Sequence, residues 1–341
     1  MFKKNLLSTL MLMMGIFILS ACSNNANSEG SANNEDDVYT IRFAMAVPET
    51  HASSIAMNEI KDSITEESDG RLVVELYDNS ELYDSDREAV EATQLGNVEA
   101  TAVATPTMAT FEESFSVFDM PFLFDDRDHA YAAMDGDLGD TLNETVEDVS
   151  LKSLGYGENG FRHIANNKHP IEKPEDLDGM KFRVIENKVY EDMFNELGTN
   201  ASPLAFGELY TSLQQGVYDG MDNPISLIST MKFNEVQDYL TLSSHTFAPI
   251  ISVINKEYFE SMPEDLQELL EEKMIEFNDR QREITQEQDE EYLEELEDDM
   301  EITELTDEEK EAFADELQPI YDKYEDSIGE DLLEMVEEVK K

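Results

Sequence analysis

The sequence contains a single cysteine among its 341 residues. One cysteine cannot form a disulfide within the chain, and it leaves no second thiolate for a structural zinc site. None of the five histidines belongs to an H-E-x-x-H pattern, and no G-x-S-x-G element is present. Carboxylate pairs occur throughout, so no single pair indicates acid–base chemistry. We therefore predict no metal, no cofactor and no enzymatic activity.

Positive charge is also scarce, because 23 Lys and Arg stand against 79 Asp and Glu, a formal net charge of −56. This balance argues against nucleic-acid binding, which requires a basic face, and against docking on anionic lipid head groups. The acidic residues are spread over the whole mature chain, so we interpret them as a solvated, halo-adapted surface suited to a salty or alkaline exterior. An acidic sink for cations or for a basic partner is the alternative.

Only one long apolar run is present, from Leu6 to Leu19, and it is too short to cross a bilayer comfortably. It follows two lysines and ends at residues 19–22, Leu-Ser-Ala-Cys, which predicts a secretory signal peptide over residues 1–22. This ending resembles the lipobox of bacterial lipoproteins, in which the cysteine is acylated and becomes the mature N-terminus. The resemblance predicts a protein anchored to the cell membrane through Cys22, on its extracytoplasmic face. An ordinary cleaved signal with a chance cysteine is the alternative.

After a flexible, polar linker at residues 23–37, strand-like and helix-like segments alternate. Alternation of this kind predicts an α/β fold with a parallel or mixed sheet. The predicted strands are residues 38–44, 71–77, 98–105, 151–156, 161–165, 180–184 and 250–255. The predicted helices are 53–67, 88–95, 189–197, 208–215, a long helix with Pro263 at its first position, a packed acidic helix at 287–301 and a final helix capped by Thr306 and Glu309.

Two glycine-containing motifs resemble ligand sites but have simpler interpretations. Residues 155–160 match G-x-G-x-x-G, yet a β-like stretch follows where a dinucleotide site needs a helix. We interpret these glycines as allowing the chain to turn between two parts of the fold. Residues 135–140, Asp-Gly-Asp-Leu-Gly-Asp, lack the ligand spacing of an EF-hand loop, and we expect a helix-capping turn there.

Two arginines are the informative polar residues, because each lies in an apolar segment of a chain with few cations. Arg183 lies in the strand-like run 180–184, and Arg162 follows Phe161. A buried arginine must be paired, and its planar guanidinium matches a carboxylate with two parallel hydrogen bonds. The partner is either one of the many acidic residues of the chain or the carboxylate of a ligand. The residues alone leave both possibilities open.

The segment 205–224, AFGELYTSLQQGVYDGMDNP, closely resembles the signature of the solute-binding proteins of tripartite ATP-independent periplasmic (TRAP) transporters. The segments 118–124, 175–184 and 235–240 agree with that family in the same order, so the resemblance covers nearly all of the mature chain. It implies a two-lobed α/β fold of the periplasmic-binding-protein, type II-like class. The ligand would lie in a cleft between the lobes, and crossing segments would form the hinge.

The same resemblance implies a domain division and a set of ligand-binding residues. The lobes would comprise residues 38–160 with 249–288, and 161–248 with 289–341. In that family the arginine at the position of Arg183 grips the ligand carboxylate, and the one at Arg162 often assists. The asparagine at Asn223 donates a hydrogen bond to the ligand, the aromatic at Phe206 packs on it, and Asn187 and His51 are further candidates. The family commonly has glutamate where this chain has Asp222, which leaves the support of Asn223 in question.

The predicted function is an extracytoplasmic receptor that binds a small organic acid, a C4-dicarboxylate or a sugar acid such as a uronate, and delivers it to TRAP membrane subunits. A secreted lipoprotein enzyme acting on organic acids is the alternative, and it would turn over the bound acid. A structural surface protein is a third class, although the chain has no internal repeat.

Overall fold

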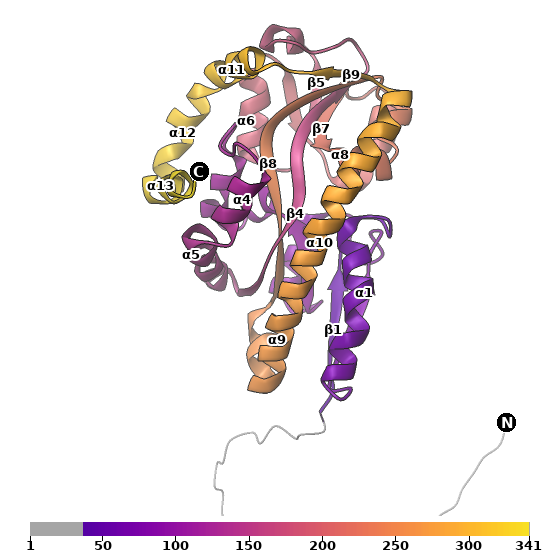
Figure 1. Ribbon diagram of the computed structural model, residues 1–341, viewed down its shortest axis with the longest axis vertical. Coiled ribbons are helices and arrows are strands. Elements are labelled where there is room, and N and C mark those ends of the chain that lie inside the picture. Colours follow the sequence, from indigo (N-terminus) through magenta and orange to yellow (C-terminus); the bar gives the residue numbers. More distant parts are fainter. Residues whose placement is uncertain (1–36, 341) are drawn as a thin grey trace, which may run out of the picture. The chain divides into compact units, whose positions relative to one another are not determined.

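One nine-stranded sheet runs through residues 37–340, the part of the chain that the computed structural model describes (Figure 1). The strand order is β2-β1-β3-β8-β4-β7-β5-β6, and β9 pairs with β8. The strands are β1 Tyr39–Ala44, β2 Leu72–Tyr77, β3 Ala100–Ala104, β4 Leu151–Asn166, β5 Lys181–Val184, β6 Asn200–Pro203, β7 Gly220–Pro224, β8 Tyr239–Asn255 and β9 Glu301–Glu304. The predicted α/β class is confirmed. The predicted signal peptide, Cys22 and nearly all of the predicted linker lie outside the described residues.

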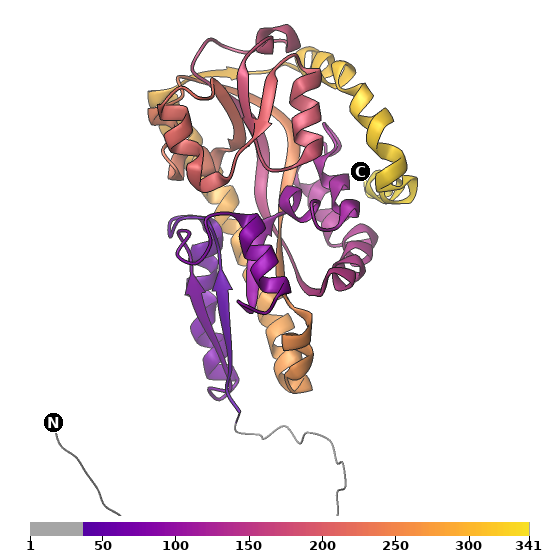
Figure 2. The same ribbon diagram turned by 180° about the vertical axis from the view of Figure 1, so that it is seen from behind.

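Helices cover the sheet on both faces (Figures 1 and 2). The α-helices are α1 Ala52–Glu67, α2 Asp86–Gln94, α3 Thr105–Met108, α4 Arg127–Met134, α5 Asp137–Thr145, α6 Lys188–Glu196, α7 Leu209–Gln214, α8 Ile225–Thr230, α9 Lys256–Ser261, α10 Glu264–Asp299, α11 Asp307–Glu316, α12 Gln318–Ile328 and α13 Glu330–Glu338. The 3-10 helices are η1 Glu113–Asp119, η2 Val146–Val149, η3 Pro174–Leu177, η4 Phe206–Glu208 and η5 Phe233–Glu235. No helix among the described residues is both long and apolar enough to cross a membrane.

The two ends of the sheet are separate groups of parallel strands. At one end β1 pairs in parallel with β2 and with β3, and at the other end β5 pairs in parallel with β6 and with β7. Each group has its own apolar core: α1 and the first half of α10 pack on the first, while α7, α8 and the end of α10 pack on the second. Figure 2 shows the two groups at opposite ends, in space, of the part of the molecule that the structure describes. The sequence patterns predicted all three strands of the first group but only β5 of the second, because β6 and β7 were not predicted.

Two long antiparallel strands, β4 and β8, join these groups and pair with each other along most of their length. The sequence predicted two strands at 151–156 and 161–165, whereas the chain forms one strand of 16 residues. The glycines at 155 and 160 have positive φ angles, and irregularities in the pairing fall at Ser153/Tyr156 and Glu158/Gly160. They bend the strand without ending it. At about 3.3 Å per residue, a strand of this length extends roughly 50 Å and can span both groups.

A single helix, α10, runs beside these two strands over 36 residues (Figure 1). Pro263 is its N-cap and does not occupy the predicted first position. The acidic segment predicted as a packed helix is its continuation to Asp299, with Leu296 buried. Thr306 and Glu309 form the predicted capping box at the start of α11, but this helix is not the final one, because α12 and α13 follow it. Gly329, with φ of +100°, separates the last two.

Residues 105–149, where the sequence predicted no element apart from the helix-capping turn at 135–140, form α3, η1, α4, α5 and η2. They share one apolar core with α6, α12 and α13. The motif at 135–140 is the predicted helix start, with Gly136 as the N-cap of α5. The division into two lobes at the predicted residue boundaries stays a prediction.

Candidate functional site

Arg183 lies near the C-terminal end of β5, the strand between β7 and β6. Phe182 and Val184 flank it in the strand, and all three are buried, with Arg183 at 2% exposure. Its Nε and Nη2 donate hydrogen bonds of 3.0 and 2.7 Å to the carbonyl oxygen of Leu204. Burial lowers the pKa of Arg183 to about 10, and the more distant carboxylate of Asp222 offsets this only in part. Arg183 is thus a buried cation with no carboxylate bonded to it among the described residues.

Arg162 on β4 is paired inside the protein. Its Nε lies 2.5 Å from Oδ2 of Asp222, and its Nη2 donates a 2.6 Å hydrogen bond to the Asp222 carbonyl oxygen. The guanidinium also lies over the ring of Tyr190, and Nε2 of His245 is 3.5 Å from the same carboxylate oxygen. Although burial opposes ionisation of both partners, their mutual attraction raises the pKa of Arg162 and lowers that of Asp222. Asp222 therefore supports Arg162.

Each arginine keeps one nitrogen for another partner. The hydrogen bonds above use Nε and Nη2, and among residues 37–340 no group accepts a hydrogen bond from Nη1 of Arg162 or of Arg183. A buried cation with an unused donor is stabilised by an anion, and a carboxylate accepts several such hydrogen bonds. The sequence left two possible partners for each arginine, an acidic residue of the chain or the carboxylate of a ligand. Arg162 is paired with an acidic residue of the chain, whereas Arg183 is not.

A cavity lies beside these arginines, between the two groups of parallel strands. It encloses about 670 Å³ of empty space, which includes open solvent at its mouth. Its polar lining includes Ser53, Ser85, Asp86, Arg87, Thr107, Asn159, Arg162, Arg183, Glu186 and Asn223. Its apolar lining includes Met45, Val47, Ala102, Ala104, Ile185, Leu204, Phe206, Leu227 and Ile250.

Four of the six predicted ligand residues line this cavity: Arg183, Arg162, Asn223 and Phe206. Asn223 is 2% exposed on β7, immediately after Asp222, and the register of β7 against β4 brings it beside His163. Phe206 begins η4 and packs edge to face on Phe233, with 6.2 Å between ring centroids. Segments far apart in sequence therefore meet at one site.

The other two candidates cap helices and do not line the cavity. The side-chain oxygen of Asn187 accepts hydrogen bonds from the first turn of α6, and its Nδ2 donates to Pro106 and Asp119. Nδ1 of His51 accepts a hydrogen bond from the backbone of Ser53 at the start of α1. Burial lowers the pKa of His51 to about 4, so its ring is neutral at physiological pH and offers no charge to an anion. Both side chains have structural roles in this arrangement.

Seven polar residues of the cavity were not found by sequence reasoning, among them Asp86, Glu186 and Asn159. Two of them are acids in a chain with 79 acidic residues, so their type carried no information. Asn159 lies inside the glycine motif. That motif is part of β4 and does not open a helix, so the dinucleotide reading fails on geometry, as predicted. Among residues 37–340 no group of His, Cys, Asp and Glu is placed to hold a metal ion.

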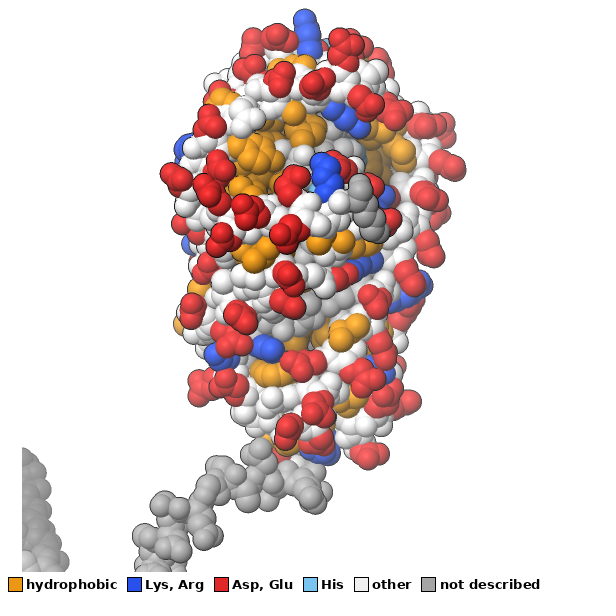
Figure 3. All heavy atoms as spheres, turned by 60° about the vertical axis from the view of Figure 1, so that its left-hand side comes forward, with side chains coloured by type: hydrophobic (Ala, Val, Ile, Leu, Met, Phe, Trp, Pro, Cys, Tyr) orange, Lys and Arg blue, Asp and Glu red, His pale blue; other side chains and the backbone are white. Residues whose placement is uncertain are grey.

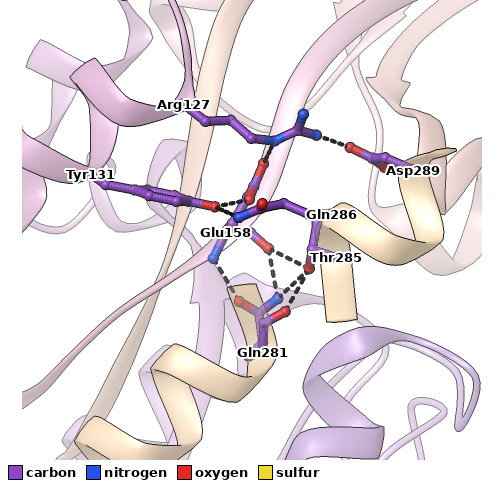
Figure 4. A network of polar contacts seen from close by, with 7 residues as sticks. All are labelled: Arg127, Tyr131, Glu158, Gln281, Thr285, Gln286 and Asp289. Atoms are coloured by element: carbon purple, nitrogen blue, oxygen red, sulfur yellow. Dashed lines mark hydrogen bonds and ion pairs between the residues drawn. The ribbon is translucent and has the colours of Figure 1, made fainter. Parts of the chain in front are cut away.

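Helix α10 is bonded to β4 through Gln281 and Glu158 (Figure 4). The backbone N–H of Glu158 donates to Oε1 of Gln281 at 2.7 Å, and Nε2 of Gln281 donates to the Glu158 carbonyl oxygen at 2.6 Å. Nε of Arg127 donates to the Glu158 carboxylate at 2.7 Å, and Arg127 also pairs with Asp289 on α10. Tyr131 donates a further hydrogen bond to Glu158. This network joins α4, β4 and α10 beside residues that line the cavity.

The family model for bacterial extracellular solute-binding proteins, family 7 (DctP), matches residues 43–327. The chain belongs to this family. The C4-dicarboxylate-binding protein DctB of Bacillus subtilis (strain 168) is 31% identical over 307 residues, which cover 89% of this chain and 87% of that protein. The family confirms the predicted resemblance and the extracytoplasmic location. It also confirms the prediction of a solute receptor that is not an enzyme.

Two solved structures agree with this fold along most of their length. The sugar acid binding protein DctPAm of Advenella mimigardefordensis, in complex with galactonate, has a TM-score of 0.86 and 32% identity, with 89% of this chain and 99% of that chain covered. A TRAP periplasmic solute-binding protein from Sulfurospirillum deleyianum, with bound succinate, has a TM-score of 0.84 and 33% identity, with 89% and 100% covered. These similarities confirm the predicted fold class.

Proposed function

We propose that this protein is the extracytoplasmic receptor of a TRAP transporter and that it binds a small organic acid by its carboxylate in the cavity beside Arg183. The observation that carries this proposal is a buried guanidinium that has a carbonyl oxygen as its partner and an unused Nη1 group. A charge-assisted hydrogen bond in a desolvated pocket is much stronger than the same bond in water. A ligand carboxylate would supply the negative charge that the protein does not place there.

The neighbouring residues take supporting roles in this proposal. Arg162, fixed by Asp222, presents its Nη1 to the same carboxylate, and the Asn223 amide donates to a ligand oxygen. Phe206 supplies an apolar wall. We leave Asn187 and His51 out of the proposed site, because their side chains are occupied as helix caps.

Binding would close two lobes around the acid. We propose that the groups built on β1–β3 and on β5–β7 are the lobes, and that β4, β8 and α10 are the segments that cross between them. The ligand would shift the balance from open to closed forms by contacting both lobes, as in other hinge-closing receptors. The closed receptor would then deliver the acid to the TRAP membrane subunits.

We further propose that Cys22 carries the lipid anchor that holds the receptor at the membrane, as the lipobox resemblance implies. The acidic exterior would be an adaptation to salt, and Figure 3 supports this with acidic side chains spread over the whole visible face. The negative electrostatic field of this acidic exterior repels anions at long range. The local positive charge of the two arginines is therefore needed for an acid to bind.

Isothermal titration calorimetry on the purified protein tests the proposal. Galactonate, glucuronate and succinate are suitable ligands, since acids of these classes occupy related receptors. At least one should bind stoichiometrically, and ligand binding should raise the melting temperature by mass action. Saturable binding of none of a broad panel of organic acids would refute the proposal. Turnover of a bound acid would favour the enzyme alternative.

A further inference from the structure

The cavity that holds Arg183 also contains two carboxylates, Asp86 and Glu186. A pocket built to receive a dianion would exclude such groups, since like charges in a low-dielectric site repel strongly. Their presence in the cavity therefore carries information about the charge of the ligand.

Asp86 is fixed at the start of α2. Ser85 is the N-cap of that helix, Asp86 is its first residue, and Oδ2 of Asp86 accepts a 3.3 Å hydrogen bond from the backbone N–H of Ala104 on β3. Burial raises the pKa of Asp86 to about 6, an effect that the Ala104 N–H and the charge of Arg183 oppose. Oδ1 accepts no hydrogen bond from any described residue. A carboxylate in this state is a strong acceptor with capacity left for a donor.

Glu186 follows Arg183 by three residues, after the end of β5. Among residues 37–340 no side chain or backbone group forms a hydrogen bond or an ion pair with its carboxylate. It is close enough to Asp86 and to Arg183 to raise the pKa of each, although burial dominates both shifts. The cavity thus offers unused acceptors on two of its walls.

The charges of the groups that line the cavity distinguish between two ligand classes, dicarboxylates and sugar acids with a single carboxylate. Arg162 is paired with Asp222, and Arg87 with the exposed Glu91, which leaves Arg183 as the cation of the cavity lining that has no carboxylate partner among the described residues. Against it stand Asp86 and Glu186. One carboxylate of a ligand satisfies Arg183 and the unused Nη1 of Arg162. A second carboxylate would meet a surplus of negative charge.

We infer that the ligand is a polyhydroxylated monocarboxylic acid, an aldonate or uronate, and that Asp86 selects it by accepting hydrogen bonds from its hydroxyl groups while repelling the second carboxylate of a dicarboxylate. This inference rests on the proposed function of the same cavity. Hydroxyl groups of the ligand can donate to Oδ1 of Asp86 and to the Glu186 carboxylate, which accept no hydrogen bond from a described residue. The apolar side chains of Phe206, Leu204 and Ile250 suit the C–H surface of such a molecule.

Calorimetric titration of wild type with galactonate, galactarate and succinate tests this selection. Galactarate has the same carbon chain as galactonate with a second carboxylate at the far end, so the pair isolates the effect of that charge. Wild type should bind galactonate at least about tenfold more tightly than either dianion. Asp86→Asn should weaken galactonate binding by about tenfold to a hundredfold, because a charged acceptor is lost. The same change should strengthen galactarate binding.

Glu88→Gln is the matched control, since it removes one negative charge from an exposed position of α2 outside the cavity. Its three affinities should stay within about threefold of wild type. Tighter binding of galactarate or succinate than of galactonate by wild type would overturn the inference and leave the proposed receptor function standing. Asp86→Asn with an unchanged galactonate-to-galactarate ratio would also overturn it. If none of these and no other organic acid binds, both proposals fail together.

Discussion

Arg162 and Asp222 form an ion pair in which neither side chain reaches solvent, with 1% and 0% exposure and 2.5 Å between Nε and Oδ2. Arg162 lies on β4 and Asp222 on β7, and antiparallel pairing of these strands sets Ile164, two residues after Arg162, opposite Asp222. Two residues along a strand return a side chain to the same face, so the sheet itself aligns the pair. The pair fixes one guanidinium at the edge of the cavity.

Asp222→Asn should destabilise the protein strongly, because it leaves a guanidinium buried without a counter-charge. Breaking such a pair on one side costs about 3–5 kcal/mol of unfolding free energy. Urea unfolding followed by circular dichroism measures this cost. Asp265→Asn is the control, since it breaks the exposed pair with Arg71 and should have a much smaller effect. Equal effects of the two substitutions would show that the buried Arg162–Asp222 pair contributes no more to stability than an exposed pair does.

The contribution of the Arg162–Asp222 pair to the free energy of unfolding should depend on pH in a defined direction. Folding lowers the pKa of Asp222, so its contribution is fully present above the unfolded value of about 4 and is lost as the pH falls below it. The stability difference between wild type and Asp222→Asn should therefore narrow as the pH is lowered below about 4. A difference that stays constant down to the acid limit of folding would contradict the lowered pKa.

Sequence reasoning found the arginines for a physical reason: a cation in an apolar strand of an acidic chain must have a partner. It could not find Asp86 or Glu186, because an acid is uninformative where acids are common. Their role depends on which helix start and strand end face the cavity. Gly155 and Gly160 suggested a turn, since glycine readily adopts the positive φ angles that many turns require. The long pairing of β4 with β8 carries the strand through both positions, and such long-range pairing leaves no local signal.

Arg183→Lys should weaken binding of a responding acid while the protein remains folded. Lysine keeps the charge but cannot make the parallel hydrogen bonds of a guanidinium. Loss of a desolvated, charge-assisted contact costs about 2–5 kcal/mol, a weakening of roughly thirtyfold to several thousandfold. Titration calorimetry with the best ligand of wild type measures it. Binding within about threefold of wild type would make Arg183 a structural residue.

A carboxamide or ester analogue of that ligand gives an independent check. It keeps the shape and the hydroxyl groups but lacks the charge that Arg183 and Arg162 are placed to meet. The analogue should fail to bind wild type at concentrations that saturate with the acid. If it binds equally well, the cavity recognises shape and hydroxyl groups, and neither arginine is the anchor.

Gly157→Ala should destabilise the contact between β4 and α10. A Cβ atom at this position would lie 2.5 Å from Oε1 of Gln281, whose two hydrogen bonds to Glu158 hold it in place. Overpacking of this kind costs about 1–3 kcal/mol of unfolding free energy. A double-mutant cycle with Gln281→Ala provides the control, since removing the glutamine makes room for the methyl group. The double variant should therefore lose less stability than the sum of the two single variants, and strict additivity would exclude the clash.

Cys22→Ala should release the receptor from the membrane fraction or leave it unprocessed, because the acyl anchor requires the cysteine thiol. Cell fractionation and the intact mass of the mature protein measure the outcome. Ser23→Ala is a suitable control, since it keeps the lipobox residues. A wild-type mature mass without acyl chains would refute the anchor, as would equal membrane retention of Cys22→Ala.

Added salt should raise the melting temperature, because the net charge of −56 destabilises the folded state by self-repulsion. Screening acts at low concentrations: the Debye length falls from about 30 Å at 0.01 M to about 10 Å at 0.1 M and about 3 Å at 1 M. The largest gain per decade should therefore come before general salting-out becomes important. Sodium chloride and potassium chloride should act equally at the same ionic strength, whereas sucrose, which screens no charge, should not reproduce the steep early rise. A flat or falling curve over this range would show that ion pairs such as Arg280–Glu59, which salt weakens, outweigh the repulsion.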